Sequence, residues 1–176
     1  IHQDFEMGGV SPTVEVFSNR VEISNPGEPI VPVERFIDGY QSRNERLADL
    51  MRRFGICEEK SSGIDRVIES AELMQLPAPE FLTGHKRTTV VIYGPRAFRE
   101  MNGSDRVRAC YQHCVLQYVL RKQMTNQSLR ERFGLSEGSS NTVSQIITAT
   151  MEQRLVKNDP NAPDSRRYAR YIPIWA

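Results

Sequence analysis

Small polar side chains recur at helical spacing near the C-terminus, on one face of a helix expected to begin near Ser139 or Ser140. An apolar set that includes Val143, Ile146 and Ile147 marks the opposite, buried face of this helix. Amide and hydroxyl side chains on a narrow helix face can form hydrogen bonds with base edges and phosphates in the major groove of duplex DNA. The candidate DNA-binding residues of this face are Ser140, Asn141, Ser144, Gln145 and Thr148.

A polar loop that contains arginines follows this helix. Residues 155–157 and 168–174 alternate between apolar and polar side chains as strands do, and the segment between them is polar and contains two prolines. Arginines at the tip of such a hairpin can contact a phosphate or the minor groove. We therefore add Arg166, Arg167 and Arg170 to the candidate DNA-binding residues.

Two further helices are expected to position the polar face. Helical spacing of Val107, Cys110 and Cys114 predicts a helix over 105–122, and Thr125 is a good N-cap for a helix over 126–133. This order of three helices and a hairpin over 105–176 resembles the winged helix-turn-helix regulators. The resemblance implies that the third helix enters a DNA groove and that the hairpin contacts the backbone. A protein–protein module of the same architecture is the alternative.

Charge divides the sequence at the same place. Residues 105–176 contain eleven Lys and Arg against six Asp and Glu, whereas residues 1–104 contain twelve against sixteen. A basic segment suits a polyanionic partner such as DNA, and an acidic one does not. The net charge of +1 for the whole chain conceals this difference.

Two turns in the N-terminal half contain glycine. Ser61-Ser62-Gly63 precedes an expected helix, and the backbone N–H groups at a helix start favour an anion. Asn25-Pro26-Gly27 ends an alternating hairpin over 13–24 whose turn is Ser18-Asn19. The alternative is that these glycines only make turns and helix caps.

The N-terminal region is predicted to be an α+β domain over 1–94, with helices packed on an antiparallel sheet. Apolar residues at helical spacing predict helices over 44–54 and 64–73, and β-branched runs predict strands at 81–82 and 87–93. Residues 95–104 are expected to be a linker, because they are bounded by Gly94-Pro95 and Asn102-Gly103-Ser104.

Four phrases of this region, at 20–27, 43–44, 47–55 and 61–64, occur in an order that resembles the C-terminal region of bacterial RecG-like helicases or transcriptional regulators. Those proteins usually have an AlbA-type (Schlafen-like) domain ahead of this region. The resemblance implies a divergent histidine-kinase-type ATPase fold (GHKL or Bergerat-like) that binds ATP with Mg²⁺. Carried over by position, the nucleotide-binding residues would be His2, Asp4, Asn25, Gly27, Ser62 and Gly63.

The sequence departs from a working ATPase of that family. Asn25 stands where the resemblance places an adenine-binding Asp, the turn at 61–63 has one glycine, and the Glu and Asn that serve water and Mg²⁺ would precede His2. The chain also has no Gly-x-x-x-x-Gly-Lys-Ser/Thr phosphate loop. We therefore expect no catalytic residues and no helicase motor. A DNA-binding regulator is the first hypothesis, and an ATP-binding module with a docking winged helix is the alternative.

The cysteines predict neither a disulfide framework nor a metal site. The sequence has three, and Cys110 and Cys114 lie on the apolar side of the helix expected over 105–122, where a thiol acts as a small hydrophobic group. Three free thiols fit a reduced, cytoplasmic protein, and no apolar run reaches the roughly 20 residues of a membrane span. We expect this chain, which begins at Ile1, to be part of a longer protein that forms a homodimer on DNA.

Overall fold

The computed structural model describes residues 1–176 apart from 8–10, 58–61, 164 and 166–167. The chain divides into two compact units. Unit 1 comprises Ile1–Val67 and Pro79–Gly94, and unit 2 comprises Ile68–Ala78 and Pro95–Ala176. The α+β class predicted from the sequence is confirmed, since an antiparallel sheet and helices are both present.

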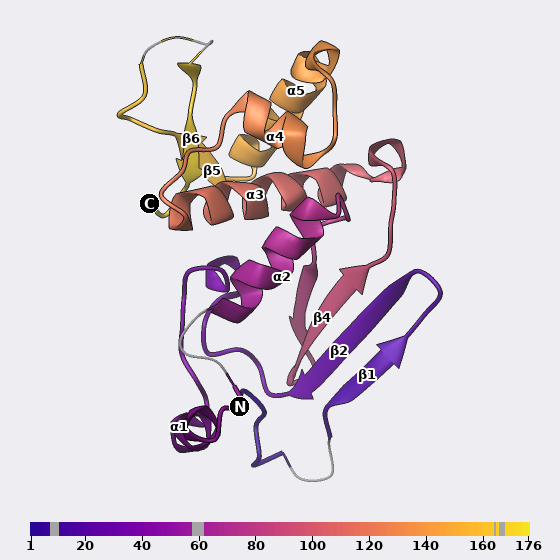
Figure 1. Ribbon diagram of the computed structural model, residues 1–176, viewed down its shortest axis with the longest axis vertical. Helices are drawn as coiled ribbons and strands as arrows, with labels where there is room; N and C mark the ends of the chain where they lie inside the picture. Colours follow the sequence, from indigo (N-terminus) through magenta and orange to yellow (C-terminus); the bar gives the residue numbers. More distant parts are fainter. Residues whose placement is uncertain (8–10, 58–61, 164, 166–167) are drawn as a thin grey trace. The chain divides into compact units, whose positions relative to one another are not determined.

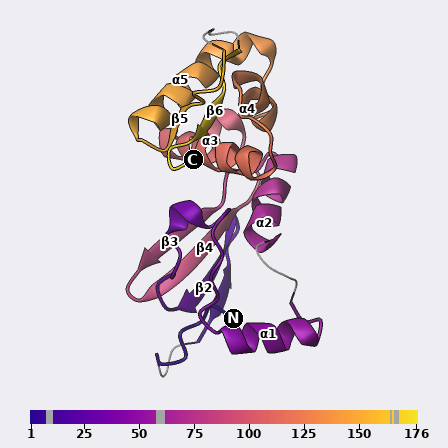
Figure 2. The same cartoon turned by 90° about the vertical axis from the view of Figure 1, so that its left-hand side faces the viewer.

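A four-stranded antiparallel sheet forms the centre of unit 1 (Figure 1). Its strands are β1 (Thr13–Val16), β2 (Arg20–Pro26), β3 (Glu80–Gly84) and β4 (Arg87–Tyr93), in the order β1-β2-β4-β3. Figure 2 shows β3, β4 and β2 side by side. β-Branched residues favour these strands, and Ile23 pairs with Val90 while Val90 pairs with Phe81, so an apolar row crosses the sheet.

Tight turns set the register of both hairpins. The Phe17 backbone N–H donates to the Arg20 carbonyl at 2.9 Å, which makes Ser18-Asn19 the turn, as the sequence predicted. His85 and Lys86 join β3 to β4 with φ values of 50° and 58°. Two consecutive left-handed residues are the geometry of a type I′ turn, whose twist matches that of the strands it joins.

The helical part of unit 1 consists of the 3-10 helix η1 (Val33–Arg35), α1 (Glu45–Arg53) and the first half of α2 (Ser62–Leu73). Phe36, just after η1, packs edge-to-face on Phe81 of β3 with ring centroids 5.1 Å apart. Ala48 of α1 is buried, whereas Leu50 and the adjoining Phe54 are exposed.

Unit 2 contains the second half of α2 and seven further elements. They are the 3-10 helices η2 (Phe98–Glu100) and η3 (Glu137–Ser139), the helices α3 (Gly103–Val119), α4 (Asn126–Arg132) and α5 (Ser140–Glu152), and the antiparallel strands β5 (Val156–Asn158) and β6 (Tyr171–Pro173). α3 contacts α5 and β6, and α4 contacts α5 (Figures 1 and 2). Three helices and a hairpin thus follow one another in the predicted order.

Side-chain caps explain where two of these helices begin. The Asn102 side chain accepts from the Asp105 backbone N–H at 2.8 Å, so α3 begins at Gly103, two residues before the predicted start. Thr125 caps α4 as predicted, because its side chain accepts from the Ser128 N–H at 3.1 Å. The expected cap of α5 differs: the Ser139 side chain makes no cap hydrogen bond, and η3 leads into the helix instead.

The segment expected to be a linker is packed within unit 2. Met101 is buried, and the Phe98 ring lies edge-to-face against Phe133 at 5.0 Å between centroids. α3 likewise differs from its predicted single apolar stripe. Every residue from Ala109 to Leu116 is buried, including Gln112 and His113. Within the described part of the chain, no helix has the length and apolar character needed to cross a membrane.

The hairpin of unit 2 is attached to α3 by aromatic residues. Trp175, just after β6, packs edge-to-face on Tyr118 with ring centroids 5.6 Å apart. Its indole N–H donates to the Tyr111 hydroxyl at 3.3 Å. These contacts anchor the end of the hairpin to α3 through Trp175.

Candidate functional site

The polar face of α5 is exposed on unit 2. Asn141, Gln145 and Thr148 are exposed, while Val143 and Ile147 on the opposite side are buried. Asn141 and Gln145 make no side-chain hydrogen bond to any residue that the structure describes. The hydrogen-bond donors and acceptors of their amide groups are therefore available to a partner.

Asn126 of α4 links the start of α5 to α4. Its amide N–H₂ donates to the Ser140 carbonyl at 3.0 Å and to the Ser144 hydroxyl at 2.9 Å. Its amide oxygen accepts from the Ser140 hydroxyl at 3.3 Å and from Arg130 Nε at 3.1 Å. Two of the predicted DNA-binding residues, Ser140 and Ser144, thus also fix the angle between the two helices.

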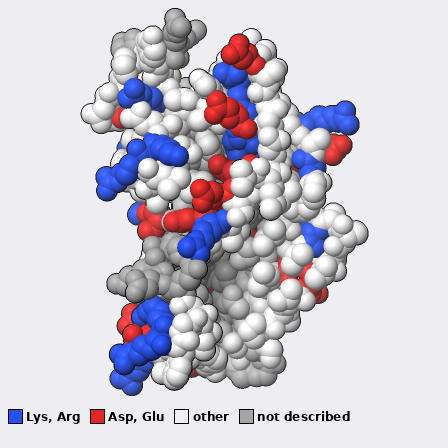
Figure 3. All heavy atoms as spheres, viewed as in Figure 1, with Lys and Arg blue, Asp and Glu red and all other residues white. Residues whose placement is uncertain are grey.

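Of the three arginines predicted to bind DNA from the hairpin, the structure describes only Arg170. Arg166 and Arg167 lie outside the described residues. Arg170 is half-buried, and its carbonyl accepts from the Asp159 backbone N–H at 2.9 Å, which extends the β5–β6 pairing by one bond. Figure 3 shows Lys and Arg side chains over this hairpin and a separate group over α1 of unit 1. The α1 group was not singled out by the sequence analysis.

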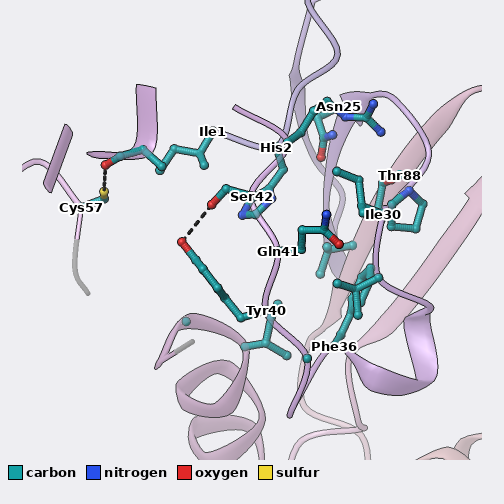
Figure 4. A pocket seen from close by; sticks show the side chains of 18 of the residues that line it. Ile1, His2, Asn25, Ile30, Phe36, Tyr40, Gln41, Ser42, Cys57 and Thr88 are labelled. Atoms are coloured by element: carbon teal, nitrogen blue, oxygen red, sulfur yellow. Dashed lines mark hydrogen bonds between the residues drawn. The ribbon is translucent and has the colours of Figure 1, made fainter. Parts of the chain in front are cut away.

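A cavity of about 610 Å³ lies within unit 1 (Figure 4). Volumes of this order accommodate drug-sized ligands. The sheet forms one wall through Asn25, Thr88 and Val90, and the segments 1–2, 28–43, 48–57 and 63–67 form the others. Figure 4 shows the side chain of His2 and those of Phe36 and Gln41, which belong to the segment 28–43, lining this cavity.

The structure brings some of the predicted nucleotide-binding residues together. His2, Asn25 and Gly63 line the cavity. Asp4 and Gly27 do not line it but lie close to each other, because a Cβ built on Gly27 would lie 3.3 Å from the Asp4 backbone nitrogen. The side chain of Ser62 lies outside the described residues.

Gly27 has both a left-handed backbone and a close neighbour. Its φ is +102°, and a Cβ built on it would lie 2.8 Å from Asp4 Cβ. We therefore expect Gly27→Ala to lower the free energy of unfolding by about 1–3 kcal/mol, as strained backbone positions typically do. Urea denaturation of the chain measures this change.

Gly103→Ala is the matched control for that substitution. No atom lies within 4 Å of a Cβ built on Gly103, the first residue of α3. Alanine favours a helix, so this variant should be as stable as the parent or slightly more so. An equal loss of stability in both variants would contradict a specific role for Gly27.

Sequence reasoning missed much of the cavity lining. Ile30, Val31, Phe36 and Tyr40 come from the segment 28–43, which reads as a loop because it contains Pro29 and Pro32. The sequence signal that could have revealed this lining was the number of large apolar residues in the segment, which is unusual for a loop. Tyr40 is tied to the wall by a 2.9 Å hydrogen bond between its hydroxyl and that of Ser42.

The two thiols of α3 are interior groups. Burial raises the pKa of Cys110 to about 12, and it raises the pKa of Cys114 still further. Both therefore stay protonated at neutral pH and act as small hydrophobic side chains, the role assigned to them from the sequence. Cys57 of unit 1 is half-buried, and its thiol donates to the Ala48 carbonyl at 3.8 Å.

Comparison with known families gives a match in the N-terminal half of the chain. Residues 9–92 match the family model described as "Putative ATP-dependent DNA helicase recG C-terminal". The antiparallel sheet with helices fits an ATPase-like α+β domain of this kind, as the resemblance predicted for this part of the chain. The comparison with curated proteins found no match.

A solved structure has a similar fold. The DIP2311 protein from Corynebacterium diphtheriae is 14% identical in sequence and superposes with a TM-score of 0.54. The similarity covers 98% of this chain and 38% of that protein, so this chain spans well under half of its length. At this identity the likeness concerns the fold alone.

Proposed function

We propose that unit 2 is a winged helix-turn-helix domain that binds duplex DNA, and that the protein is a transcriptional regulator. α4 and α5 are the helix-turn-helix of this proposal, and β5 and β6 are its wing. The observation that carries it is the exposed face of α5 with Asn141, Gln145 and Thr148. Such a face fits the major groove, where amides can bind adenine edges and hydroxyls can bind bases or phosphates.

Charge supports the same function. Residues 105–176 carry eleven basic against six acidic side chains, and Arg170 lies beside the proposed wing. Cations near DNA release condensed counterions, which supplies most of the affinity that is independent of sequence. The polar face of α5 has no basic residue among 140–152, so on this proposal it reads bases while the arginines elsewhere supply affinity.

Replacing Arg166 and Arg167 together by alanine should weaken binding to all duplexes alike. If each arginine contacts one phosphate, the slope of log K against log salt should become shallower by about 0.9 for each arginine removed. Fluorescence anisotropy with a random-sequence duplex, measured at several salt concentrations, gives both quantities. An unchanged slope would mean that the wing arginines do not contact DNA.

For unit 1 we propose a sensor that also serves as the dimerisation platform of a cytoplasmic homodimer. The cavity supports the sensor role, since its lining comes from the sheet, α1 and α2 together. Two copies would bind two half-sites, which is usual for readers of this type. Light scattering of the protein with and without a two-half-site duplex tests the dimer: a monomer in both samples contradicts it.

The alternative function is an ATP-binding module in which the winged helix serves for docking. The description of the matched family favours it, together with His2, Asn25 and Gly63 at the cavity. Calorimetric titration of the full-length protein with ATP and Mg²⁺ separates the two proposals, because the Glu and Asn that serve water and Mg²⁺ would precede His2. A saturable heat of ATP binding in a protein that does not bind DNA favours the ATP-binding module. DNA binding by a protein that gives no heat with ATP favours the regulator.

A further inference from the structure

We propose that the cavity of unit 1 binds an uncharged, largely apolar small molecule that carries a hydrogen-bonding group, and not a magnesium-bound nucleoside triphosphate. This inference rests on the proposed sensor role of unit 1 and specifies the class of its ligand. Three features of the lining carry it: its apolar walls, its polar side chains, most of which have partners within unit 1, and its arginines, which lie beside acidic residues.

The walls of the cavity are mainly apolar side chains. Ile30, Val31 and Phe36 line it from the segment 28–43, and Ile64 and Val67 line it from α2. Val90 of β4 adds a further apolar side chain from the sheet. A ligand that covers these groups gains free energy roughly in proportion to the apolar surface it removes from water, about 25 cal/mol per Å².

Most polar groups of the lining already have partners inside unit 1. The buried Thr88 hydroxyl donates to the Gly27 carbonyl at 2.7 Å, and Asn25 Nδ2 donates to the Pro26 carbonyl at 3.2 Å. A purine would have to compete with these bonds. Gln41 is exposed and makes no side-chain hydrogen bond to the described residues, so it can bind a polar group of a ligand.

His2 offers a second hydrogen-bonding group without adding charge. Burial lowers its pKa, and the positive charge of Arg43 lowers it further. The imidazole is therefore neutral at pH 7 and presents one donor and one acceptor. Such a group suits an uncharged ligand better than a polyphosphate.

Each arginine of the described lining lies beside an acidic side chain of unit 1. Arg43 lies 3.6 Å from Asp4 and also donates to the Glu28 carbonyl. Arg52 lies 3.6 Å from Asp49 and donates to the Tyr40 hydroxyl at 3.3 Å. The triphosphate of ATP needs cations or backbone N–H groups that are free to bind it.

Metal ligands for a magnesium nucleotide do not gather here either. Among the described residues, no group of three or more His, Cys, Asp and Glu side chains could hold a metal ion. Mg²⁺ in nucleotide sites is bound by carboxylates together with the phosphates. Glu28 supplies the one carboxylate among the described residues that line the cavity, so this lining offers few ligands for the Mg²⁺ of a nucleotide.

Fluorescence of N-phenyl-1-naphthylamine, a neutral aromatic probe that brightens in apolar surroundings, tests the proposal on the 176-residue chain. The probe should bind the parent protein, and Ile30→Asp should weaken that binding at least about tenfold, since it places a charge on an apolar wall. Ile30 is 43% exposed, so the variant should fold normally. Val16→Asp, at a 77% exposed apolar residue outside the cavity, should bind the probe like the parent.

A competition with ATP and Mg²⁺ completes the experiment. The proposal expects no displacement of the probe by the nucleotide at millimolar concentration. It is overturned if the nucleotide displaces the probe, if the probe does not bind the parent chain, or if Ile30→Asp binds it as tightly as the parent. DNA affinity measured on the same samples keeps the two proposals apart, because a protein that binds the probe but no duplex contradicts only the regulator.

Discussion

Replacing Asn141 and Gln145 together by alanine will weaken binding to a preferred duplex at least about thirtyfold. An amide that makes two hydrogen bonds to a base edge contributes about 1–3 kcal/mol of discrimination, so two such groups contribute about 2 kcal/mol or more. Both side chains are exposed on α5, opposite Val143 and Ile147 of the core. Their removal therefore changes the surface and leaves the packing of unit 2 intact.

The measurement has two stages because the preferred sequence is unknown. Rounds of selection from a random duplex library with the parent protein give the preferred sequence, and fluorescence anisotropy then gives the affinities of both proteins. The double variant should bind random duplex like the parent, since contacts to phosphates do not depend on these amides. It should lose affinity only for the selected sequence.

Gln123→Ala with Gln153→Ala is the matched control. Both glutamines are exposed amides of unit 2, and neither belongs to the polar face of α5 defined above. This pair should leave affinity and specificity unchanged. Equal losses in the two double variants, or no loss in either, would contradict base reading by α5.

The face of α5 could be predicted because a single helix determines it. Once the periodicity of Val143, Ile146 and Ile147 fixes the buried side, the exposed side follows from 3.6 residues per turn. The sequence does not reveal that Asn126 binds Ser140 and Ser144, because that contact depends on how α4 and α5 are oriented. Helical periodicity is a local property of the sequence. A contact between side chains of two helices depends on the tertiary structure.

The cavity of unit 1 was less predictable for the same reason. Its lining extends from Ile1 to Val90, so it forms only when the segment 28–43 and the sheet residues Asn25, Thr88 and Val90 come together. A family resemblance located His2, Asn25 and Gly63 there, whereas periodicity alone could not. Phe36 and Tyr40 were missed because apolar residues in an irregular segment have no period that predicts a buried face.

A buried polar cluster in unit 2 also escaped the sequence analysis. Glu72, in the second half of α2, accepts a hydrogen bond from His113 Nδ1 of α3 at 2.9 Å. The other nitrogen of His113 lies 3.1 Å from the Ser128 hydroxyl of α4. Arg132 of α4 lies 3.7 Å from Glu72 and donates to the Leu76 carbonyl at 2.7 Å. Glu72 is thus the anion shared by two buried basic groups.

Replacing Glu72 by alanine should lower the free energy of unfolding by about 3–5 kcal/mol, because removal of one partner leaves a buried charge uncompensated. The Arg132 side chain is 1% exposed, so water cannot take the place of the lost carboxylate. Burial lowers the pKa of Arg132 and Glu72 raises it, which means that the pair holds the guanidinium in its charged form. A loss of this size is a large share of the roughly 5–15 kcal/mol that stabilises a typical domain.

Urea denaturation of Glu72→Ala beside Glu69→Ala tests this prediction. Glu69 lies one turn earlier on α2 and is exposed, so its removal should change stability by less than about 0.5 kcal/mol. Glu72→Gln should fall between the parent and Glu72→Ala, since an amide keeps a hydrogen bond to His113 but supplies no charge to Arg132. If Glu72→Ala were no less stable than Glu69→Ala, the cluster would not be what joins α2 to α3 and α4 within unit 2.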